Sequence, residues 1–255
     1  MADNWLTPDW PAPAQVQARI TTRRGGVSAG SWASMNPADH VGDAPAAVAA
    51  NRARLEERLA LPGAPRWLRQ VHGKRIVEAA GLSGLVEADG AWTATPGVVC
   101  AVLTADCLPV LLCDREGCRV AAVHAGWRGL AAGVLEEAVT RLRGARGELL
   151  AWLGPAISGE AYVVGDEVRR IFLQQQAAAQ AAFRPADSGG WHADLYALAR
   201  QRLAGCRVHA VYGGDCCTFR EPERFYSYRR DGQTGRMASL IWLRARPGFR
   251  SGIRG

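Results

Sequence analysis

The chain has 255 residues, which fits one large domain or two small ones. Hydrophobic residues make up 48% and charged residues 22%, close to the averages of globular proteins, so disorder, collagen and coiled coil are excluded as global descriptions. No stretch approaches the roughly 18 uncharged apolar residues that a membrane span needs. The first basic residue, Arg19, follows no apolar run, so we expect no secretory signal and no membrane partner.

The net charge of +7 invites a nucleic-acid interpretation, but its distribution argues against one. Four of the seven excess positive charges are arginines in the last twelve residues, which contain no acid. We therefore predict a basic, flexible tail over residues 244–255 that follows a single domain over residues 1–243. No nucleic-acid-binding motif is evident, so we expect no nucleic-acid partner.

The seven cysteines are an odd number, and Cys216 and Cys217 are adjacent. This pattern predicts free thiols and a reducing, cytoplasmic location. No CxxC pair is present, so a zinc ribbon or a thioredoxin-type redox site is unsupported.

In chain order, residues 43–60 predict a helix, because Asp43 can cap it and Pro45 suits its first turn. Short strands are expected over 67–71 and 75–79, on either side of a His-Gly turn. The nearly all-apolar runs 98–104, 108–113 and 119–123 are typical of strands buried on both faces. A helix over 130–143, a strand over 149–153, helices over 166–183 and 194–203, and strands over 208–212 and 239–243 complete the chain. Strands and helices mix without strict alternation, which favours an α/β domain with mixed sheets.

Polar residues follow several of these strands, where α/β proteins place reactive groups. His72, Cys107 and His124 lie 35 and 17 residues apart, so they meet only if three strand ends converge. Two imidazoles and a thiolate then suit Zn²⁺ with an open fourth position, and copper accepts the same ligands. On the spacing alone, the plainer interpretation is favoured: a turn histidine, a core cysteine and a strand-end histidine.

Other segments offer candidate substrate contacts, each with a plainer structural alternative. Arg128 lies between two glycines at a strand–helix junction that could bind an anion. Arg23 lies in a glycine turn, residues 21–28, that also reads as a simple hairpin, and Asn36 could contact a ligand or stabilise a turn. Tyr226 and Tyr228 stand beside arginines and could stack on a planar ring. His192 and His209 have no evident partner and are expected to be structural.

Taken together, the motifs at residues 21–28, 36–43, 70–73, 104–109, 124–130, 153–157 and 225–243 resemble the bacterial laccase-domain family, also called the polyphenol oxidase or peptidoglycan editing factor family. The resemblance implies one α/β domain with mixed sheets layered between helices, similar to bacterial toxin deamidases that use a Cys–His pair. It also implies that His72, Cys107 and His124 are the metal ligands.

The family carries three activities: copper-dependent phenol oxidation, zinc-dependent purine nucleoside chemistry, and hydrolytic editing of a peptidoglycan precursor. Five histidines are too few for a conventional laccase cluster. We therefore predict a zinc enzyme that binds purine nucleosides and phosphate and cleaves adenosine, inosine or methylthioadenosine by phosphorolysis, with possible adenosine deamination. The enzymatic alternatives that the resemblance leaves open are a peptidoglycan-precursor editing amidase and a copper-dependent polyphenol oxidase. A metal-dependent binding module is the non-enzymatic alternative.

Two roles remain open for the residues around the thiol. Cys107 is expected to be a ligand, with Asp106 orienting a ligand histidine or moving a proton. The alternative, suggested by the deamidase resemblance, makes Cys107 a nucleophile activated by His124. Arg23 or Arg128 would bind phosphate, Tyr226 or Tyr228 would lie near the purine, and the oligomeric state stays unassigned.

Overall fold

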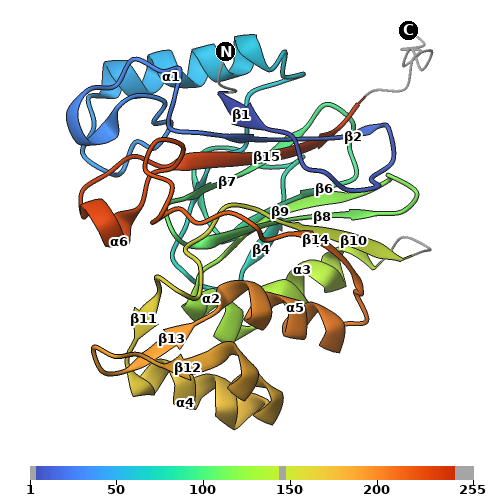
Figure 1. Ribbon diagram of the computed structural model, residues 1–255. Helices are drawn as coiled ribbons and strands as arrows, with labels where there is room; N and C mark the ends of the chain where they lie inside the picture. Colours follow the sequence, from blue (N-terminus) through green and yellow to red (C-terminus); the bar gives the residue numbers. More distant parts are fainter. Residues whose placement is uncertain (1–3, 144–147, 245–255) are drawn as a thin grey trace, which may run out of the picture.

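The computed structural model describes residues 4–143 and 148–244 and has four layers, with two packed sheets between helices (Figure 1). This arrangement confirms the expected α/β fold with mixed sheets between helical layers. Within the described residues, no helix is both long enough and apolar enough to cross a membrane. Of the predicted basic tail, only Arg244 falls among the described residues.

The larger sheet has six strands in the order β14-β10-β8-β9-β6-β4. Its centre is formed by the apolar runs, and every residue of β8, β9 and β10 is buried. Strands β4 and β6 pair in parallel, as do β10 and β14, while the other neighbours are antiparallel. The bounds are β4 Ile76–Glu78, β6 Gly90–Thr93, β8 Leu108–Asp114, β9 Val120–Ala125, β10 Leu149–Leu153 and β14 Ala210–Gly213.

The smaller of the two packed sheets is antiparallel, in the order β1-β2-β15-β7. Side chains such as Ile20, Val102 and Leu111 fill the space between it and the six-stranded sheet. Since β7 and β15 are buried along their whole length, both faces of this sheet are covered at these two strands. The bounds are β1 Trp5–Leu6, β2 Val16–Thr21, β7 Val99–Thr104 and β15 Met237–Leu243.

Helices cover the outer faces of both sheets (Figure 1). Helix α1 packs Leu55 against the β7–β15 side, while α2, α3 and α5 cover the six-stranded sheet with residues such as Leu130, Leu135 and Leu198. Asp194 caps α5 by accepting a hydrogen bond from the Ala197 N–H. The bounds are α1 Pro45–Arg58, α2 Trp127–Ala132, α3 Val134–Leu142 and α5 Leu195–Gly205.

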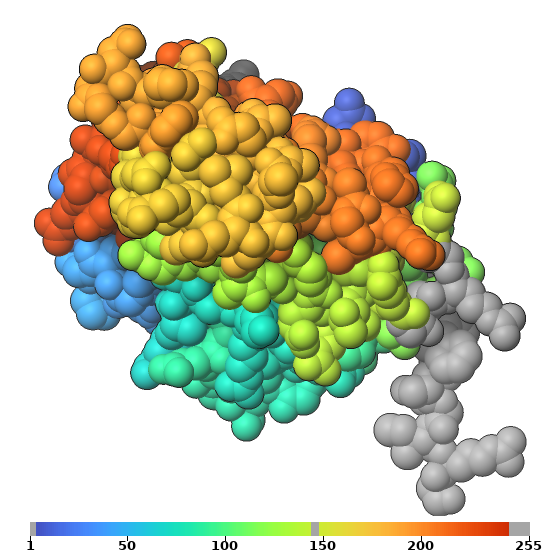
Figure 2. Space-filling view, turned by 90° about the horizontal axis from the view of Figure 1, so that it is seen from below, coloured from blue at the N-terminus to red at the C-terminus, as the bar shows by residue number. Residues whose placement is uncertain are grey.

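A small three-stranded sheet, β11-β13-β12, lies with α4 and the 3-10 helix η2 beside α5. Seen from below, these segments form the gold surface next to the orange of α5 (Figure 2). The bounds are β11 Val163–Val164, α4 Asp166–Gln175, η2 Ala177–Ala182, β12 Phe183–Pro185 and β13 Trp191–Ala193. The remaining elements are η1 Gly30–Trp32, the paired strands β3 Leu68–Arg69 and β5 Val86–Glu87, and α6 Tyr228–Asp231.

Two of the predicted helices are interrupted. The helix expected over 130–143 is two helices, because Gly133 has φ +90°, a left-handed conformation that an α-helix cannot contain. The helix expected over 166–183 ends at Gln175, since Gln176 is extended, and η2 follows before Phe183 enters a strand.

Two predicted strand arrangements are also wrong in detail. The strands expected over 67–71 and 75–79 are present but shorter, as β3 and β4, and they belong to different sheets: β3 pairs with β5, and β4 pairs with β6. Residues 21–28 are not a hairpin. The N–H of Ser28 donates to the Ser34 carbonyl at 3.0 Å, so the segment packs against the loop that follows it.

Candidate metal centre

Three strand ends bring His72, Cys107 and His124 together, with their ligand atoms all within 4.8 Å of one another. His72 follows β3, Cys107 sits in the turn between β7 and β8, and His124 lies in β9. The two imidazole rings meet edge to face, with their centroids 4.8 Å apart. The geometry thus assembles the two-imidazole, one-thiolate set that the sequence suggested.

A buried carboxylate, Asp89, holds two of these residues in place. One of its oxygens lies 2.9 Å from Nδ1 of His124 and accepts the backbone N–H of His72 at 2.8 Å. The other accepts the N–H groups of Val71 and Gly73 at 3.3 and 2.7 Å. Asp89 is fully buried. Its hydrogen bond to Nδ1 leaves Nε2 of His124 as the nitrogen available to a metal.

The loop that carries His72 is anchored at a second point. The Gln70 side chain makes a pair of hydrogen bonds with the backbone of Leu103 in β7, at 2.7 and 2.8 Å. His72 itself adopts φ +60°, a conformation that is uncommon for a residue with a Cβ. The anchors therefore fix a backbone conformation that directs His72 towards the β7–β8 turn.

Glycine is required where the segment after β9 passes the thiol. A Cβ at Gly126 would lie 2.8 Å from Sγ of Cys107 and 3.4 Å from the His72 ring. A Cβ at Gly129 would lie 3.0 Å from the Gly73 carbonyl. The glycines that sequence analysis considered as an anion site are thus needed first for close packing against the three candidate ligands.

The electrostatics of the cluster favour the ionised, thiolate form of Cys107 over the thiol. Burial raises the pKa of Cys107, but the charge and hydrogen bonds of His124, followed by those of His72, lower the pKa to about 6. Burial lowers the pKa of His124, whereas Cys107 and Asp89 raise it to about 9. A thiolate and two histidines, one of them fixed by a buried carboxylate, fit a transition-metal ion such as Zn²⁺.

A family model described as multi-copper polyphenol oxidoreductase laccase matches residues 17–244. The chain belongs to this laccase family. It is 57% identical over 240 residues to a purine nucleoside phosphorylase of Pseudomonas aeruginosa, covering 94% of this chain and 98% of the relative. It is 52% identical over 239 residues to the purine nucleoside phosphorylase YfiH of Escherichia coli K12, covering 93% and 98%.

Solved structures show the same fold. A Neisseria meningitidis protein superposes with a TM-score of 0.92 at 51% identity, covering 95% of this chain and all of that one. YlmD from Geobacillus stearothermophilus superposes with a TM-score of 0.85 at 31% identity, covering 96% and 98%. The laccase-family assignment thus extends over nearly the whole chain.

Asp106 is placed differently from the role expected for it. Its carboxylate accepts hydrogen bonds from the Thr218 hydroxyl and from the Arg229 backbone N–H, both at 2.6 Å. Its carbonyl accepts the Ile157 N–H. Asp106 therefore ties the β7–β8 turn to Thr218 and to the first turn of α6, and Asp89 is the carboxylate that orients a histidine. A proton-transfer role for Asp106 stays a prediction.

Two of the expected substrate contacts are occupied by structural bonds. The fully buried Asn36 amide contacts Asp43, Ala38 and the Arg236 N–H. The fully buried Tyr226 donates its hydroxyl hydrogen to the Trp32 carbonyl at 2.6 Å. Since these groups already bond within the protein, neither presents a free polar atom to a ligand.

Arg23 is engaged in a similar way. It donates to the carbonyls of Ala33 and Pro222 and lies 4.8 Å from the Tyr226 ring centroid. A phosphate could bind the Arg23 guanidinium only if it displaced these hydrogen bonds. The structure therefore gives Arg23 a packing role in the loop of residues 21–28.

Arg128 and Tyr228 remain available on the surface. Arg128 is exposed and stacks on Trp127, 4.4 Å from the ring centroid. Tyr228 is 61% exposed, and its ring centroid lies 5.9 Å from the Arg236 guanidinium carbon.

Two residues whose pKa responds to the charge of Cys107, Tyr162 and Arg236, are not predicted from the sequence. Burial and then the charge of Cys107 raise the pKa of Tyr162 to about 12, while Arg229 and Arg128 oppose the rise. Burial lowers the pKa of Arg236, and the charges of Cys107 and Asp106 counteract it. Arg236 falls within the family motif at 225–243, which was the one signal that could have identified it.

Proposed function

We propose that the chain is a zinc-dependent purine nucleoside phosphorylase. The observation that carries the proposal is the His72–Cys107–His124 cluster, in a laccase-family chain whose relatives in Pseudomonas aeruginosa and Escherichia coli bear that name. Two histidines and a cysteine would hold Zn²⁺ with three protein ligands, the number typical of catalytic zinc sites, which also bind water or substrate. When bound, Zn²⁺ would polarise a substrate oxygen or lower the pKa of a bound water.

The surrounding residues would bind and orient the two substrates. In phosphorolysis, a phosphate oxygen bonds to C1′ of the nucleoside while the glycosidic bond breaks, and the base leaves with its electron pair and takes a proton. The exposed guanidinium of Arg128 suits the phosphate, and the half-buried Arg236 adds positive charge beside the thiol. Tyr228 presents an exposed ring for the purine.

Copper-dependent oxidation of phenols is the alternative that the laccase family name suggests. A multicopper oxidase passes electrons from one copper to a separate multinuclear centre, which needs a second set of ligands. In residues 4–143 and 148–244, His72, Cys107 and His124 form the single cluster of three or more His, Cys, Asp and Glu side chains close enough to hold a metal. One three-ligand cluster supports hydrolytic or transfer chemistry better than multicopper oxidation.

The deciding experiment incubates the purified protein with adenosine, with and without phosphate, and separates the products. We expect adenine and ribose 1-phosphate only when phosphate is present. Inosine as the sole product would indicate deamination instead. Absence of nucleoside turnover, together with amide hydrolysis of a nucleotide-linked muramyl amino acid, would overturn the proposal in favour of the peptidoglycan alternative. Heat protection by adenosine without any turnover would identify a binding module.

Metal dependence is tested in the same preparation. We expect about one Zn²⁺ per chain in protein made without added metal, and reversible inactivation by a chelator. His72→Ala should lower activity by more than about 100-fold, because loss of a ligand exceeds the usual effect of losing a group that orients one. His209→Ala is the matched control, since His209 is exposed and outside the cluster. Full activity in metal-free protein would contradict the zinc assignment.

A further inference from the structure

The guanidinium of Arg236 lies at the end of the fold that carries the Cys107 thiol. Arg236 directly precedes β15, whose first residue, Met237, pairs with Thr104 at the end of β7. Cys107 follows in the turn between β7 and β8, and its negative charge accordingly acts on the pKa of Arg236. Tyr228 shares this location, since its ring centroid lies 5.9 Å from the guanidinium carbon.

The loop before Arg236 is held at three points. Asn36 accepts the Arg236 backbone N–H through Oδ1 at 3.0 Å, and the Thr234 hydroxyl donates to the middle carbonyl of η1 at 3.3 Å. The Tyr226 ring packs directly on Gly235, because a Cβ there would lie only 2.7 Å from it. The point at which the Arg236 side chain leaves the backbone is therefore fixed, and Asn36 is a positioning residue for it.

One edge of the guanidinium is used and the other is free. Nη1 donates to the carbonyls of Thr234 and Gly235 at 2.9 and 3.0 Å, which sets the plane of the group. Nε and Nη2 make no hydrogen bond or ion pair with any described residue. Both nitrogens retain contact with solvent, because neither is among the fully buried polar atoms that lack a partner. Their N–H bonds point in parallel, an arrangement that matches two oxygens of one anion.

Among the described residues, no carboxylate pairs with this guanidinium. Asp106 is near enough for its charge to act on the pKa of Arg236, but its two oxygens accept the Thr218 hydroxyl and the Arg229 backbone N–H. Burial, followed by the charge of Arg236, lowers the pKa of His40, so this imidazole is neutral at pH 7. The half-buried guanidinium stays protonated, and an anion is the partner that it lacks within the described chain.

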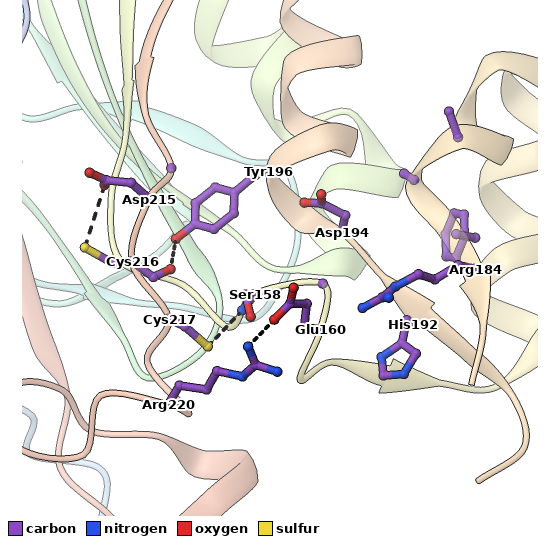
Figure 3. A pocket seen from close by; sticks show the side chains of 15 residues that line it. Ser158, Glu160, Arg184, His192, Asp194, Tyr196, Asp215, Cys216, Cys217 and Arg220 are labelled. Atoms are coloured by element: carbon purple, nitrogen blue, oxygen red, sulfur yellow. Dashed lines mark hydrogen bonds and ion pairs between the residues drawn. The ribbon is translucent and has the colours of Figure 1, made fainter. Parts of the chain in front are cut away.

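The cavity beside the small three-stranded sheet, of about 460 Å³, is a poorer place for an anion (Figure 3). Its lining sets three carboxylates against two arginines: Glu160, Asp194 and Asp215 against Arg184 and Arg220. Figure 3 shows Arg220 turned towards Glu160, with which it forms an ion pair. None of the three candidate metal ligands lines this cavity. An anion that takes part in the reaction is therefore expected at the free edge near the thiol instead.

We propose that the Nε–Nη2 edge of Arg236 binds the inorganic phosphate of the reaction through two parallel hydrogen bonds. This assignment rests on the proposed phosphorolysis and names the residue that holds its anionic substrate. Two phosphate oxygens face Arg236, which leaves another free to bond to C1′ while the bond from C1′ to the purine nitrogen breaks. The base keeps that electron pair and takes up, through solvent, the proton that hydrogen phosphate gives up. Since Tyr228, the proposed purine contact, lies beside the guanidinium, the two substrates would meet where attack on C1′ requires.

The test is equilibrium dialysis of the zinc-loaded full-length protein against radiolabelled inorganic phosphate at constant ionic strength, without nucleoside. We expect one site per chain, and affinity at least about tenfold weaker in Arg236→Gln, because hydrogen bonds to a charged group are lost. Arg236→Lys should also weaken binding, since lysine keeps the charge but cannot make two parallel hydrogen bonds. The zinc content should stay unchanged in both variants. Arg19→Gln is the matched control, because Arg19 is half-buried and lies in β2, away from the β7–β8 turn.

A measurement on the wild type does not depend on how the variants fold. Phenylglyoxal modifies arginine side chains, and peptide mapping by mass spectrometry identifies the modified residues. Phosphate should protect Arg236 from modification and should leave the modification of Arg19 unchanged.

Absence of phosphate binding to the wild type, unchanged affinity in Arg236→Gln, an equal loss in Arg19→Gln, or no protection of Arg236 by phosphate would each overturn the assignment. Acetate competing as well as phosphate would do the same, because the edge would then be a carboxylate site. The dialysis contains no nucleoside, so its outcome is separate from that of the adenosine assay. Phosphate bound at Arg236 in protein that does not cleave adenosine would leave this assignment standing and overturn the phosphorolysis alone.

Discussion

The carboxylate of Asp89 lies 2.9 Å from Nδ1 of His124 and also accepts the backbone N–H of His72. One buried side chain thus positions two of the three candidate metal ligands. It fixes the ring orientation of His124, and it holds the backbone of the His72 loop, whose left-handed conformation at His72 needs support. The bonds from Val71 and Gly73 make this carboxylate the acceptor for three consecutive backbone N–H groups.

Replacement of Asp89 with Asn should therefore weaken metal binding by roughly 10- to 100-fold, because one amide nitrogen cannot accept the hydrogen bonds that a carboxylate oxygen does. Competition with a chromogenic chelator measures this affinity. Asp114→Asn is the control, since Asp114 is equally buried and accepts a backbone N–H from Cys118 in the β8–β9 turn, away from the cluster. Equal metal affinity in the Asp89→Asn variant and the wild type would remove Asp89 from the site.

The sequence indicates the three candidate ligands but not the residue that orients them. His72, Cys107 and His124 stand in motifs next to apolar runs, and the family resemblance singles them out. Asp89 precedes a strand of four residues, Gly90–Thr93, with no recognisable pattern. Its role becomes apparent only when that strand pairs with β9, which places Asp89 beside His124. The sequence instead points to Asp106 for this role, because Asp106 is adjacent to Cys107 in the chain.

In the fold, likewise, some elements are predictable from the sequence and others are not. The long apolar runs that became β7, β8, β9 and β10 are predictable because they are buried on both faces. The three-stranded sheet was missed because its strands have two or three residues, too few for a pattern. The break at Gly133 was missed because the apolar side of the helix continues through it.

Tyr226 and Tyr228, two residues apart, should respond oppositely to substitution. Tyr226→Phe removes the hydrogen bond to the Trp32 carbonyl and should lower the free energy of unfolding by about 1 kcal/mol, without changing KM for adenosine. Tyr228→Ala should leave stability unchanged, since the ring is 61% exposed, and raise KM for adenosine. Urea denaturation and steady-state kinetics on both variants make the comparison, and the reverse pattern would place the purine at Tyr226.

Arg128→Gln should raise KM for phosphate about tenfold while the Zn²⁺ content stays at the wild-type level. The reason is that the exposed Arg128 guanidinium, whose charge acts on Tyr162 as that of Cys107 does, can supply charge-assisted hydrogen bonds to the phosphate and is not a metal ligand. Phosphate-dependent initial rates provide the measurement. Arg141→Gln, which changes an arginine of α3 that is 51% exposed, controls for the loss of one surface charge. An equal rise in KM in both variants would show a general charge effect.

The final prediction concerns the reactivity of Cys107. Its pKa of about 6 means that the thiol of metal-free protein is mostly ionised at pH 7 and becomes protonated as the pH falls below 6. Burial instead raises the pKa of Cys216 to about 11 and that of Cys113 to about 12, which keeps these thiols protonated and unreactive. Iodoacetamide at pH 7 should thus modify Cys107 in chelator-treated protein much faster than Cys113 or Cys216, as peptide mapping by mass spectrometry would show.

Zinc should protect Cys107 from this modification, because a metal-bound thiolate has its lone pair engaged. Protection and activity should then return together as Zn²⁺ is added back. The exposed Cys118 is the internal reference, since metal should leave its modification unchanged. If Cys107 is instead a nucleophile, metal-stripped protein should stay active and should lose its activity when Cys107 is alkylated. That result would reassign Cys107 from ligand to nucleophile, with His124 as its base.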